Sequence, residues 1–279
     1  MTKESPVLSL RGMNKQFGEG CSRCIEKPEN LEKNYCPNCG TVYACRDISF
    51  DLYKGEIIGI VGESGSGKST LMRSLYFDSE VTDGEYLLAD YKDGQENVFG
   101  SSLQQQKWIR NMLLGMVYQN PLLGLRMEFS SIANIAEKMI AANHRNVEAM
   151  FSRGHELLDK VNIPTFRSSE APKNFSGGMQ QRVQIAKALS NNPPVLLLDE
   201  VTTGLDLSVQ ADVLDLIKTI QRELRISMIV VSHDLAVIRM LSDRTIVMYN
   251  GEIIEEGLTD QVLEDPQHAY TQQLVYSLL

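Results

Sequence analysis

The chain has 279 residues, of which 43% are hydrophobic and 23% are charged, values typical of an ordinary globular protein. Its formal net charge of -9 argues against general nucleic-acid binding, because a phosphate backbone requires a basic surface. The first residues contain no apolar run long enough for a signal peptide, and no run of about eighteen apolar residues occurs anywhere. We therefore expect a cytoplasmic protein with reduced thiols.

The predicted elements follow one another as an α/β protein would arrange them. A short strand over Val7–Leu10 leads into a turn region that ends at Phe17. The continuous apolar run over Ile57–Val61 indicates a parallel strand that is covered on both faces. Further strands are expected at Gly115–Tyr118, Val195–Leu198, Met228–Val231 and Thr245–Met248, and apolar residues at helical spacing predict a helix over Val209–Leu224. The stretch from Pro121 to Asn174 is rich in helix formers and is expected to be a helical subdomain.

The stretch "GESGSGKS" follows the strand at 57–61 and has the spacing of a phosphate-binding loop. Its glycines allow backbone N–H groups to surround phosphate oxygens, and the helix that follows adds its positive N-terminus. Lys68 is expected to reach the β- and γ-phosphates, while the Ser69 hydroxyl would bind Mg²⁺. The predicted nucleotide-binding residues here are Gly62, Glu63, Ser64, Gly65, Ser66, Gly67, Lys68, Ser69 and Thr70.

The stretch "VLLLDE" is a second feature of nucleotide hydrolysis. Four apolar residues form a buried strand, and Asp199 and Glu200 follow at its end. Asp199 is placed to hold Mg²⁺, and Glu200 could polarise the attacking water. Two acids after a strand are weak evidence alone, but they become strong evidence when they follow a phosphate-binding loop.

Taken together, these motifs resemble those of an ATP-binding-cassette (ABC) ATPase. The stretch "FSGGMQQRVQIAKAL", Phe175 to Leu189, is similar to the family's signature segment. The resemblance implies that Ser176, Gly177 and Gly178 face the γ-phosphate of ATP held by a partner subunit. The protein would then be a homodimer or a pseudo-dimer with another ABC subunit.

Further motifs in the same order support the resemblance. It implies that Gln119 is the Q-loop glutamine, which senses Mg²⁺ and the γ-phosphate, and that Asp206 belongs to the D-loop. His233 resembles the switch histidine, and Phe17 resembles the aromatic residue that stacks on adenine. The expected fold is α/β: a P-loop, RecA-like ABC ATPase domain (1–279) with a helical subdomain (121–174) and a small inserted zinc-ribbon-like lobe (18–45).

The partner of this ATPase is a separate question. Several stretches, including "EDPQHAYTQQLVYSLL", resemble a branch that contains dipeptide and oligopeptide importer ATPases and the ATP-binding subunit of the carbon–phosphorus lyase system. Gly124–Arg126 and "SSIANIAEKMI" resemble the lyase subunit, so a role in a phosphonate-degrading carbon–phosphorus lyase core complex is the first hypothesis. The alternative is an importer for dipeptides, oligopeptides or nickel, with membrane permease subunits as partners. A nucleic-acid-repair ATPase with a zinc module is disfavoured by the overall acidity.

Two Cys-x-x-Cys pairs, Cys21 with Cys24 and Cys36 with Cys39, stand apart from the ATPase motifs. Four thiolates at this spacing match tetrahedral coordination of Zn²⁺ or iron, and zinc is preferred because nothing here demands redox activity. Cys45 lies outside the pattern and is expected in the core. Because the insert is too short to bury a core, the metal would hold its fold. We expect a structural lobe that contacts a partner subunit.

Overall fold

The computed structural model describes residues 5–25 and 31–276. These residues fall into two compact units: the first unit comprises the described residues up to 101 and from 231 on, and the second unit comprises 102–230. The division lies inside the region predicted as one ATPase domain, and residues 26–30 of the predicted insert lie outside the described residues. Among the described residues, no helix combines the length and the apolar character needed to cross a membrane.

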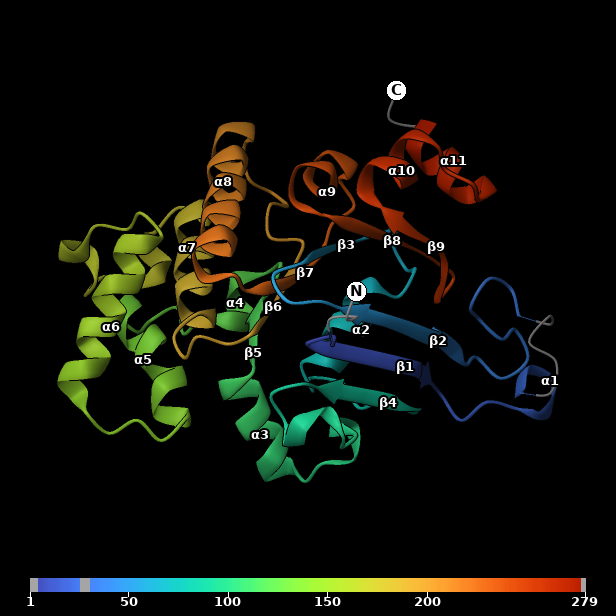
Figure 1. Ribbon diagram of the computed structural model, residues 1–279, viewed down its shortest axis with the longest axis horizontal. Coiled ribbons are helices and arrows are strands. Elements are labelled where there is room, and N and C mark those ends of the chain that lie inside the picture. Colours follow the sequence, from blue (N-terminus) through green and yellow to red (C-terminus); the bar gives the residue numbers. More distant parts are fainter. Residues whose placement is uncertain (1–4, 26–30, 277–279) are drawn as a thin grey trace. The chain divides into compact units, whose positions relative to one another are not determined.

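Three antiparallel strands form a sheet of the first unit in the order β2-β1-β4 (Figure 1). Their bounds are Leu8–Phe17 for β1, Val42–Leu52 for β2 and Asp83–Leu88 for β4. Alternate residues near the start of β1 are fully buried, and the β1–β2 register shifts several times between Leu10 and Gln16. The inserted lobe, with the short helix α1 (Ser22–Ile25), lies at the far end of the β1–β2 hairpin (Figure 1).

Strand β3 (Ile57–Val61) of the first unit pairs in parallel with β8 (Arg244–Tyr249), which pairs antiparallel with β9 (Glu252–Leu258). Every residue of β3 is buried, as expected for a strand covered on both faces. Besides α1, the helices found in the described residues of this unit are α2 (Lys68–Leu75), α9 (Leu235–Leu241), α10 (Thr259–Glu264) and α11 (Ala269–Tyr276), with 3₁₀ turns η2 (Lys92–Gly94) and η3 (Val98–Gly100).

The second unit combines parallel strands with a group of helices (Figure 1). Strand β5 (Leu114–Val117) pairs in parallel with β6 (Val195–Asp199), and β7 (Ser227–Val231) follows β6 in the sheet order. Its helices are α3 (Leu103–Met112), α4 (Pro121–Gly124), α5 (Ser131–Ala141), α6 (Val147–Lys160), α7 (Gly177–Ala188) and α8 (Leu207–Leu224), with 3₁₀ turns η4 (Thr165–Arg167) and η5 (Pro172–Asn174).

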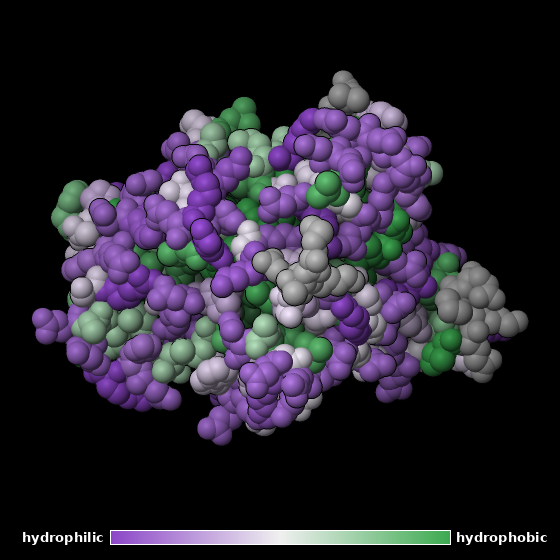
Figure 2. All heavy atoms as spheres, in the orientation of Figure 1, coloured by the Kyte–Doolittle hydropathy of each residue, from purple (hydrophilic) through white to green (hydrophobic). Residues whose placement is uncertain are grey.

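The α/β fold class is confirmed, and the buried strands lie within a residue or two of their predicted positions. The N-terminal strand was predicted too short, because β1 continues through Phe17, where a turn region was expected. Its second half carries polar residues and register shifts, which hide the alternation typical of strands. The face of the molecule in Figure 2 is mostly hydrophilic, and apolar residues form small separate groups on it.

Candidate nucleotide-binding and metal sites

The loop between β3 and α2 has the backbone that a phosphate-binding loop requires. Gly62, Gly65 and Gly67 all have positive φ, and Gly67 is the N-cap of α2. A Cβ atom on Gly62 would lie 2.1 Å from the Met248 carbonyl oxygen, and one on Gly67 would lie 2.1 Å from the Ala44 carbonyl oxygen. Only glycine fits at these two positions, because both the conformation and the space exclude a side chain.

The Lys68 side chain folds back over this loop. Its Nζ donates to the carbonyl oxygens of Gly62 and Glu63, at 2.7 and 2.8 Å, and to the Ser66 hydroxyl at 3.3 Å. Only 5% of Lys68 is exposed, so the ammonium group is held by loop oxygens. Ser69 and Thr70 follow in the first turn of α2. A cation enclosed by a glycine-rich loop at a helix N-terminus is suited to binding phosphate anions.

Two further contacts on the loop come from residues that the sequence motifs did not single out. The Glu63 N–H donates to the Tyr270 hydroxyl oxygen at 2.8 Å, and the Tyr270 ring stacks on Tyr249 with centroids 4.1 Å apart. The Gly251 N–H donates to the Ser66 carbonyl at 3.1 Å. Of Tyr249, Gly251 and Tyr270, only Tyr270 lies in a stretch that carries the family resemblance, because it belongs to "EDPQHAYTQQLVYSLL".

Gln119 and Glu200 meet in the second unit, although 81 positions separate them in the chain. The Gln119 Nε2 donates to Glu200 Oε2 at 2.9 Å, and the Thr203 hydroxyl donates to the same oxygen at 3.2 Å. Glu200 follows buried β6 and has a φ of 46°, an unusual value for a residue with a side chain. The preceding Asp199 is 4% exposed. The glutamine and the glutamate that sequence motifs assigned to catalysis are thus in direct contact.

The signature segment forms the beginning of α7. Ser176 is the N-cap, and its hydroxyl accepts from the Met179 N–H. Gly177 is exposed, whereas Gly178 is buried against α8, where a Cβ atom would lie 2.2 Å from Val209 Cγ1. Gly178 therefore allows close packing of α7 on α8, and the exposed N-terminal turn remains available to an anion.

Two buried glutamines of α7 hold the strand end that carries Gln119. The Gln184 side chain accepts from the Tyr118 N–H at 2.6 Å and donates to the Tyr118 carbonyl at 3.1 Å. The Gln181 side chain donates to the Gln119 carbonyl at 3.2 Å and accepts from Gln184 at 2.9 Å. These positioning residues were missed, because nothing in the spacing shows that a helix contacts a strand more than sixty positions away.

The remaining predicted residues lie at the ends of elements. Asp206 is the N-cap of α8, where hydrogen bonds, the largest from the Val209 N–H, hold the pKa of its carboxyl below the usual range. His233 is exposed and directly precedes Asp234, the N-cap of α9. Phe17 ends β1 with 50% of its surface exposed, and the Lys15 Nζ lies 4.8 Å from its ring centroid.

The four cysteines of the two Cys-x-x-Cys pairs meet, with all their sulfur atoms within 4.8 Å of one another. The Sγ–Sγ distances are 3.7 Å for Cys21–Cys24, 3.9 Å for Cys21–Cys36 and 3.7 Å for Cys24–Cys39. Four sulfurs around a tetrahedral ion with bonds of about 2.3 Å would be about 3.8 Å apart. The cluster therefore fits one metal ion, and the separations are far too long for disulfides.

Hydrogen bonds favour the thiolate at Cys21 and Cys24, whereas burial raises the pKa of the Cys36 thiol to about 11. The Asn38 amide donates to Cys21 Sγ at 3.4 Å, and this bond is the largest cause of a pKa lowered to about 6. The Tyr43 hydroxyl donates to Cys24 Sγ at 3.3 Å, which also lowers a thiol pKa. Cys45 lies apart from the cluster, as predicted, and burial raises its pKa to about 12.

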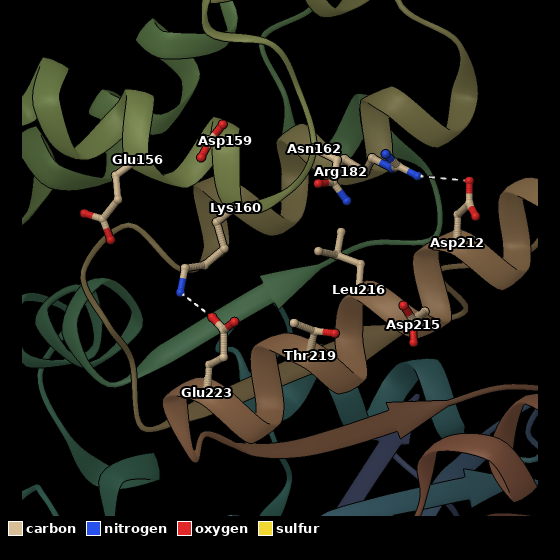
Figure 3. Close-up of a pocket in the computed structure, with 10 residues that line it drawn as sticks. All are labelled: Glu156, Asp159, Lys160, Asn162, Arg182, Asp212, Asp215, Leu216, Thr219 and Glu223. Atoms are coloured by element: carbon tan, nitrogen blue, oxygen red, sulfur yellow. Dashed lines mark hydrogen bonds and ion pairs between the residues drawn. The ribbon is translucent and has the colours of Figure 1, made fainter.

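A polar cavity of about 560 Å³ lies elsewhere in the second unit, and no predicted site residue lines it. Figure 3 shows its walls, which come from α6, α7 and α8 and carry five acidic side chains. Lys160 pairs with Glu223 at 2.7 Å, and Arg182 pairs with Asp212 at 3.4 Å. The nucleotide chemistry is thus assigned to the loops, not to this cavity.

The chain belongs to the ABC transporter family, whose sequence model matches residues 45–203, from β2 to just beyond Glu200. The matched segment contains the phosphate loop, Gln119, the signature turn and the acidic strand end. The fold agrees, because the dimeric ATP-binding cassette MJ0796, solved with ADP and Pi, aligns with a TM-score of 0.74 and 26% identity, covering 90% of this chain and 98% of that one. The protein is therefore an ATP-hydrolysing subunit of the ABC type.

Individual relatives come from two functional groups. The chain is 42% identical to a protein named for phosphonates utilization, the ATP-binding protein PhnK of Escherichia coli (strain K12), over 90% of this chain and 96% of PhnK. It is 37% identical to the oligopeptide transport ATP-binding protein OppF of Bacillus subtilis (strain 168), over 90% of this chain and 81% of OppF. A dipeptide transport protein of the same bacterium, DppD, is 36% identical.

Proposed function

We propose that this ABC subunit hydrolyses ATP as a dimer and thereby drives conformational change in a phosphonate-degrading carbon–phosphorus lyase complex. The similarity to PhnK, which spans nearly the whole length of both proteins, is the observation that carries this proposal. The importer ATPases are less similar, but the difference between 42% and 37% identity is small. A peptide importer is therefore the alternative function.

The segment Gly124–Arg126, which resembles the lyase subunit, supports the first function. A Cβ atom on Gly124 would lie 2.3 Å from Gln184 Oε1, so glycine permits the close approach of the glutamine that holds the Tyr118 backbone. The Asn134 side chain accepts from the Arg126 N–H at 2.7 Å and donates to the Arg126 carbonyl at 3.0 Å. The two segments that resemble the lyase subunit, Gly124–Arg126 and "SSIANIAEKMI", are thus hydrogen-bonded to each other. The first of them also packs against α7, the helix that positions Gln119.

For the ATP itself, we assign the phosphates to the loop at 62–70 and the adenine to Phe17. Lys68 would exchange its loop carbonyl contacts for phosphate oxygens, which bind an ammonium more strongly because they are charged. Bound Mg²⁺ would neutralise phosphate charge, with Ser69, Gln119 and Asp199 as the assigned ligands. Glu200 would accept a proton from the attacking water, and His233 would contact the γ-phosphate.

For the dimer, Ser176, Gly177 and Gly178 would contact the γ-phosphate of ATP on a second subunit, and Asp206 would lie near that contact. An exposed helix N-terminus with a polar cap is suited to this role. For the four-cysteine cluster we assign structural Zn²⁺, because four sulfur ligands leave no open position for catalysis.

For the partner complex, three exposed apolar residues follow Gln119 in the chain and form a candidate contact. Leu122 and Leu123 lie on α4, and Phe129 precedes α5. Each is 60% exposed or more, whereas most large apolar side chains of the described residues are buried. Because α4 packs against α7, a partner that moves α4 would act on the helix whose glutamines hold Gln119.

Affinity purification of the tagged protein from its own cells tests the proposed complex. A soluble assembly that contains the other subunits of a carbon–phosphorus lyase complex should co-purify with the wild-type protein. The Leu123→Ser/Phe129→Ser variant should lose it, whereas Phe151→Ser, which replaces a half-exposed aromatic residue of α6, should keep it. Integral membrane permeases in the wild-type eluate would overturn the lyase assignment in favour of an importer.

A further inference from the structure

The metal-binding lobe adds a short antiparallel segment beside β2. Tyr35 pairs with Val42, and Glu32 pairs with Tyr35 in a tight turn. Two backbone hydrogen bonds flank the first pair: the Tyr43 N–H donates to the Asn34 carbonyl at 2.7 Å, and the Cys36 N–H donates to the Thr41 carbonyl at 2.8 Å. The residues just before the second Cys-x-x-Cys pair are therefore hydrogen-bonded to the start of β2.

This pairing places Tyr35 in one row with the predicted adenine-binding residue. Val42 is the register partner of Tyr35 on one side and of Phe17 on the other. Residues directly opposite one another in antiparallel strands have side chains on the same face, and two strand spacings separate the outer residues by about 10 Å. Tyr35 and Phe17 are thus two aromatic side chains on one face, with the smaller Val42 between them.

Both aromatic side chains are largely exposed. Phe17 is 50% exposed and Tyr35 is 43% exposed, whereas Val42 is half-buried. Exposed rings are favourable surfaces on which a planar base can stack.

The neighbouring residue approaches the phosphate loop of the same unit. The Asn34 Nδ2 lies 3.5 Å from the Gly65 carbonyl oxygen, a weak hydrogen bond between two segments 31 positions apart. Gly65 is exposed with a φ of 85°, and a Cβ atom on it would meet nothing within 4 Å, so the amide approaches the exposed part of the loop. The dipeptide Asn34–Tyr35 thus lies two strand spacings from the residue assigned to adenine, on the same face, and approaches the loop assigned to phosphate through Asn34.

We propose that the Asn34–Tyr35 segment of the metal lobe is a further wall of the nucleotide site, in which Tyr35 contacts the adenine base together with Phe17. This inference rests on the assignment of ATP to Phe17 and the loop at 62–70. When the base stacks on Phe17, its edge extends over Val42 toward Tyr35. The ring and the hydroxyl of Tyr35 can then contact that edge.

The cysteine cluster holds this wall in place. Tyr35 directly precedes Cys36, and the Tyr43 hydroxyl, on the strand to which the Asn34–Tyr35 segment is bonded, donates to Cys24 Sγ at 3.3 Å. A metal ion that gathers the four sulfurs therefore fixes the position of the Tyr35 ring. Loss of the metal should weaken the contact to the base without changing any residue of the phosphate loop.

Calorimetric titration of the full-length protein with ATP and with inorganic triphosphate separates the base from the phosphates. Tyr35→Ala should raise the Kd for ATP about tenfold, which corresponds to about 1.4 kcal/mol, and should leave the Kd for triphosphate unchanged. Tyr35→Phe should retain most of the affinity. Ile25→Ala removes another exposed apolar side chain of the same lobe and should bind both ligands like the wild type.

Two results would overturn the inference. One is an ATP affinity of Tyr35→Ala equal to that of the wild type, and the other is an equal loss for ATP and triphosphate, which would indicate a distorted loop. If the assignment of ATP to Phe17 and the loop at 62–70 is itself wrong, the results differ from these two. Either Phe17→Ala would then bind ATP with wild-type affinity, or the wild type would bind neither ATP nor triphosphate. Cys36→Ser is a second, independent test of the inference. This variant should bind ATP more weakly than the wild type and should bind triphosphate with unchanged affinity.

Discussion

Glu200 has a strained backbone that is held by its surroundings. Its φ of 46° is rare for a residue with a Cβ atom, and such a conformation persists only where neighbouring contacts fix it. Here β6 is buried up to Asp199, and the carboxylate accepts hydrogen bonds from Gln119 and Thr203. Strain of this kind is characteristic of functional positions, where it directs a side chain toward the reacting atoms.

The Glu200→Gln variant tests the assignment of this carboxylate. Glutamine preserves the shape and the contact to Gln119 but cannot take a proton from water, so turnover should fall by roughly 10²-fold or more. ATP binding should remain close to that of the wild type. Phosphate release and calorimetric titration measure the two properties.

Glu223→Gln is the matched control. It changes another half-exposed glutamate of the same unit, which pairs with Lys160, and should leave turnover unchanged. Wild-type turnover in Glu200→Gln would contradict the role of Glu200.

At the level of single residues, the motifs identified Gln119 and Glu200, whose contact the structure then revealed, and they predicted the gathering of four sulfurs. They did not predict which other residues hold them. Gln184 positions the end of β5 from α7, and Tyr270 contacts the phosphate loop from a position 207 residues further along. Such contacts depend on tertiary packing, and a single sequence contains no period or spacing that indicates them.

The beginning of helix α7 serves both packing and recognition. Ser176 caps the helix, and Gly177 is exposed, but Gly178 lies against Val209 of α8 with no space for a methyl group. The resemblance to the signature segment assigned all three residues to a partner's phosphate. The packing adds a second reason for glycine at 178, which is independent of the nucleotide.

A larger residue at position 178 should therefore destabilise the protein, and a smaller residue at position 209 should partly restore its stability. Gly178→Ala should lower the free energy of unfolding by about 1–3 kcal/mol, because the new methyl group overlaps Val209 Cγ1. The Gly178→Ala/Val209→Ala double variant should lose less unfolding free energy than the sum of the losses in the two single variants. Urea unfolding measures all four proteins of this cycle, and strictly additive effects would show that the steric account is wrong.

Element prediction succeeded where burial is uniform and failed where it is mixed. The run at 57–61 became strand β3 with the predicted bounds, because all five residues are buried and apolar. The second half of β1 escaped prediction, since polar side chains and register shifts between Leu10 and Gln16 replace a regular alternation. The predicted helix at 209–224 begins two residues earlier, at Leu207, because Asp206 caps it.

On the scale of the whole molecule, the inserted lobe is the part of the chain that depends most on something other than its own packing. Its described residues expose Ile25 and Tyr35, and its buried side chains are mainly cysteines. A segment this short cannot fold on hydrophobic burial alone, and a structural zinc ion supplies on the order of 10 kcal/mol. The sequence indicated the metal, but the contact of the lobe with the phosphate loop through Asn34 required the fold.

Metal analysis of the purified protein tests this dependence directly. The wild type should contain one zinc ion per chain, and Cys39→Ser should contain far less, because the remaining three sulfurs no longer complete a tetrahedron. Cys45→Ala is the matched control: it removes a buried thiol outside the cluster and should keep the metal. Chelation should also expose the lobe to protease cleavage, since its folding energy comes from the ion. Full zinc content in Cys39→Ser would contradict the prediction, and so would a wild-type protein that binds no metal. The cluster would then be four packed thiols, and the lobe would need another source of stability.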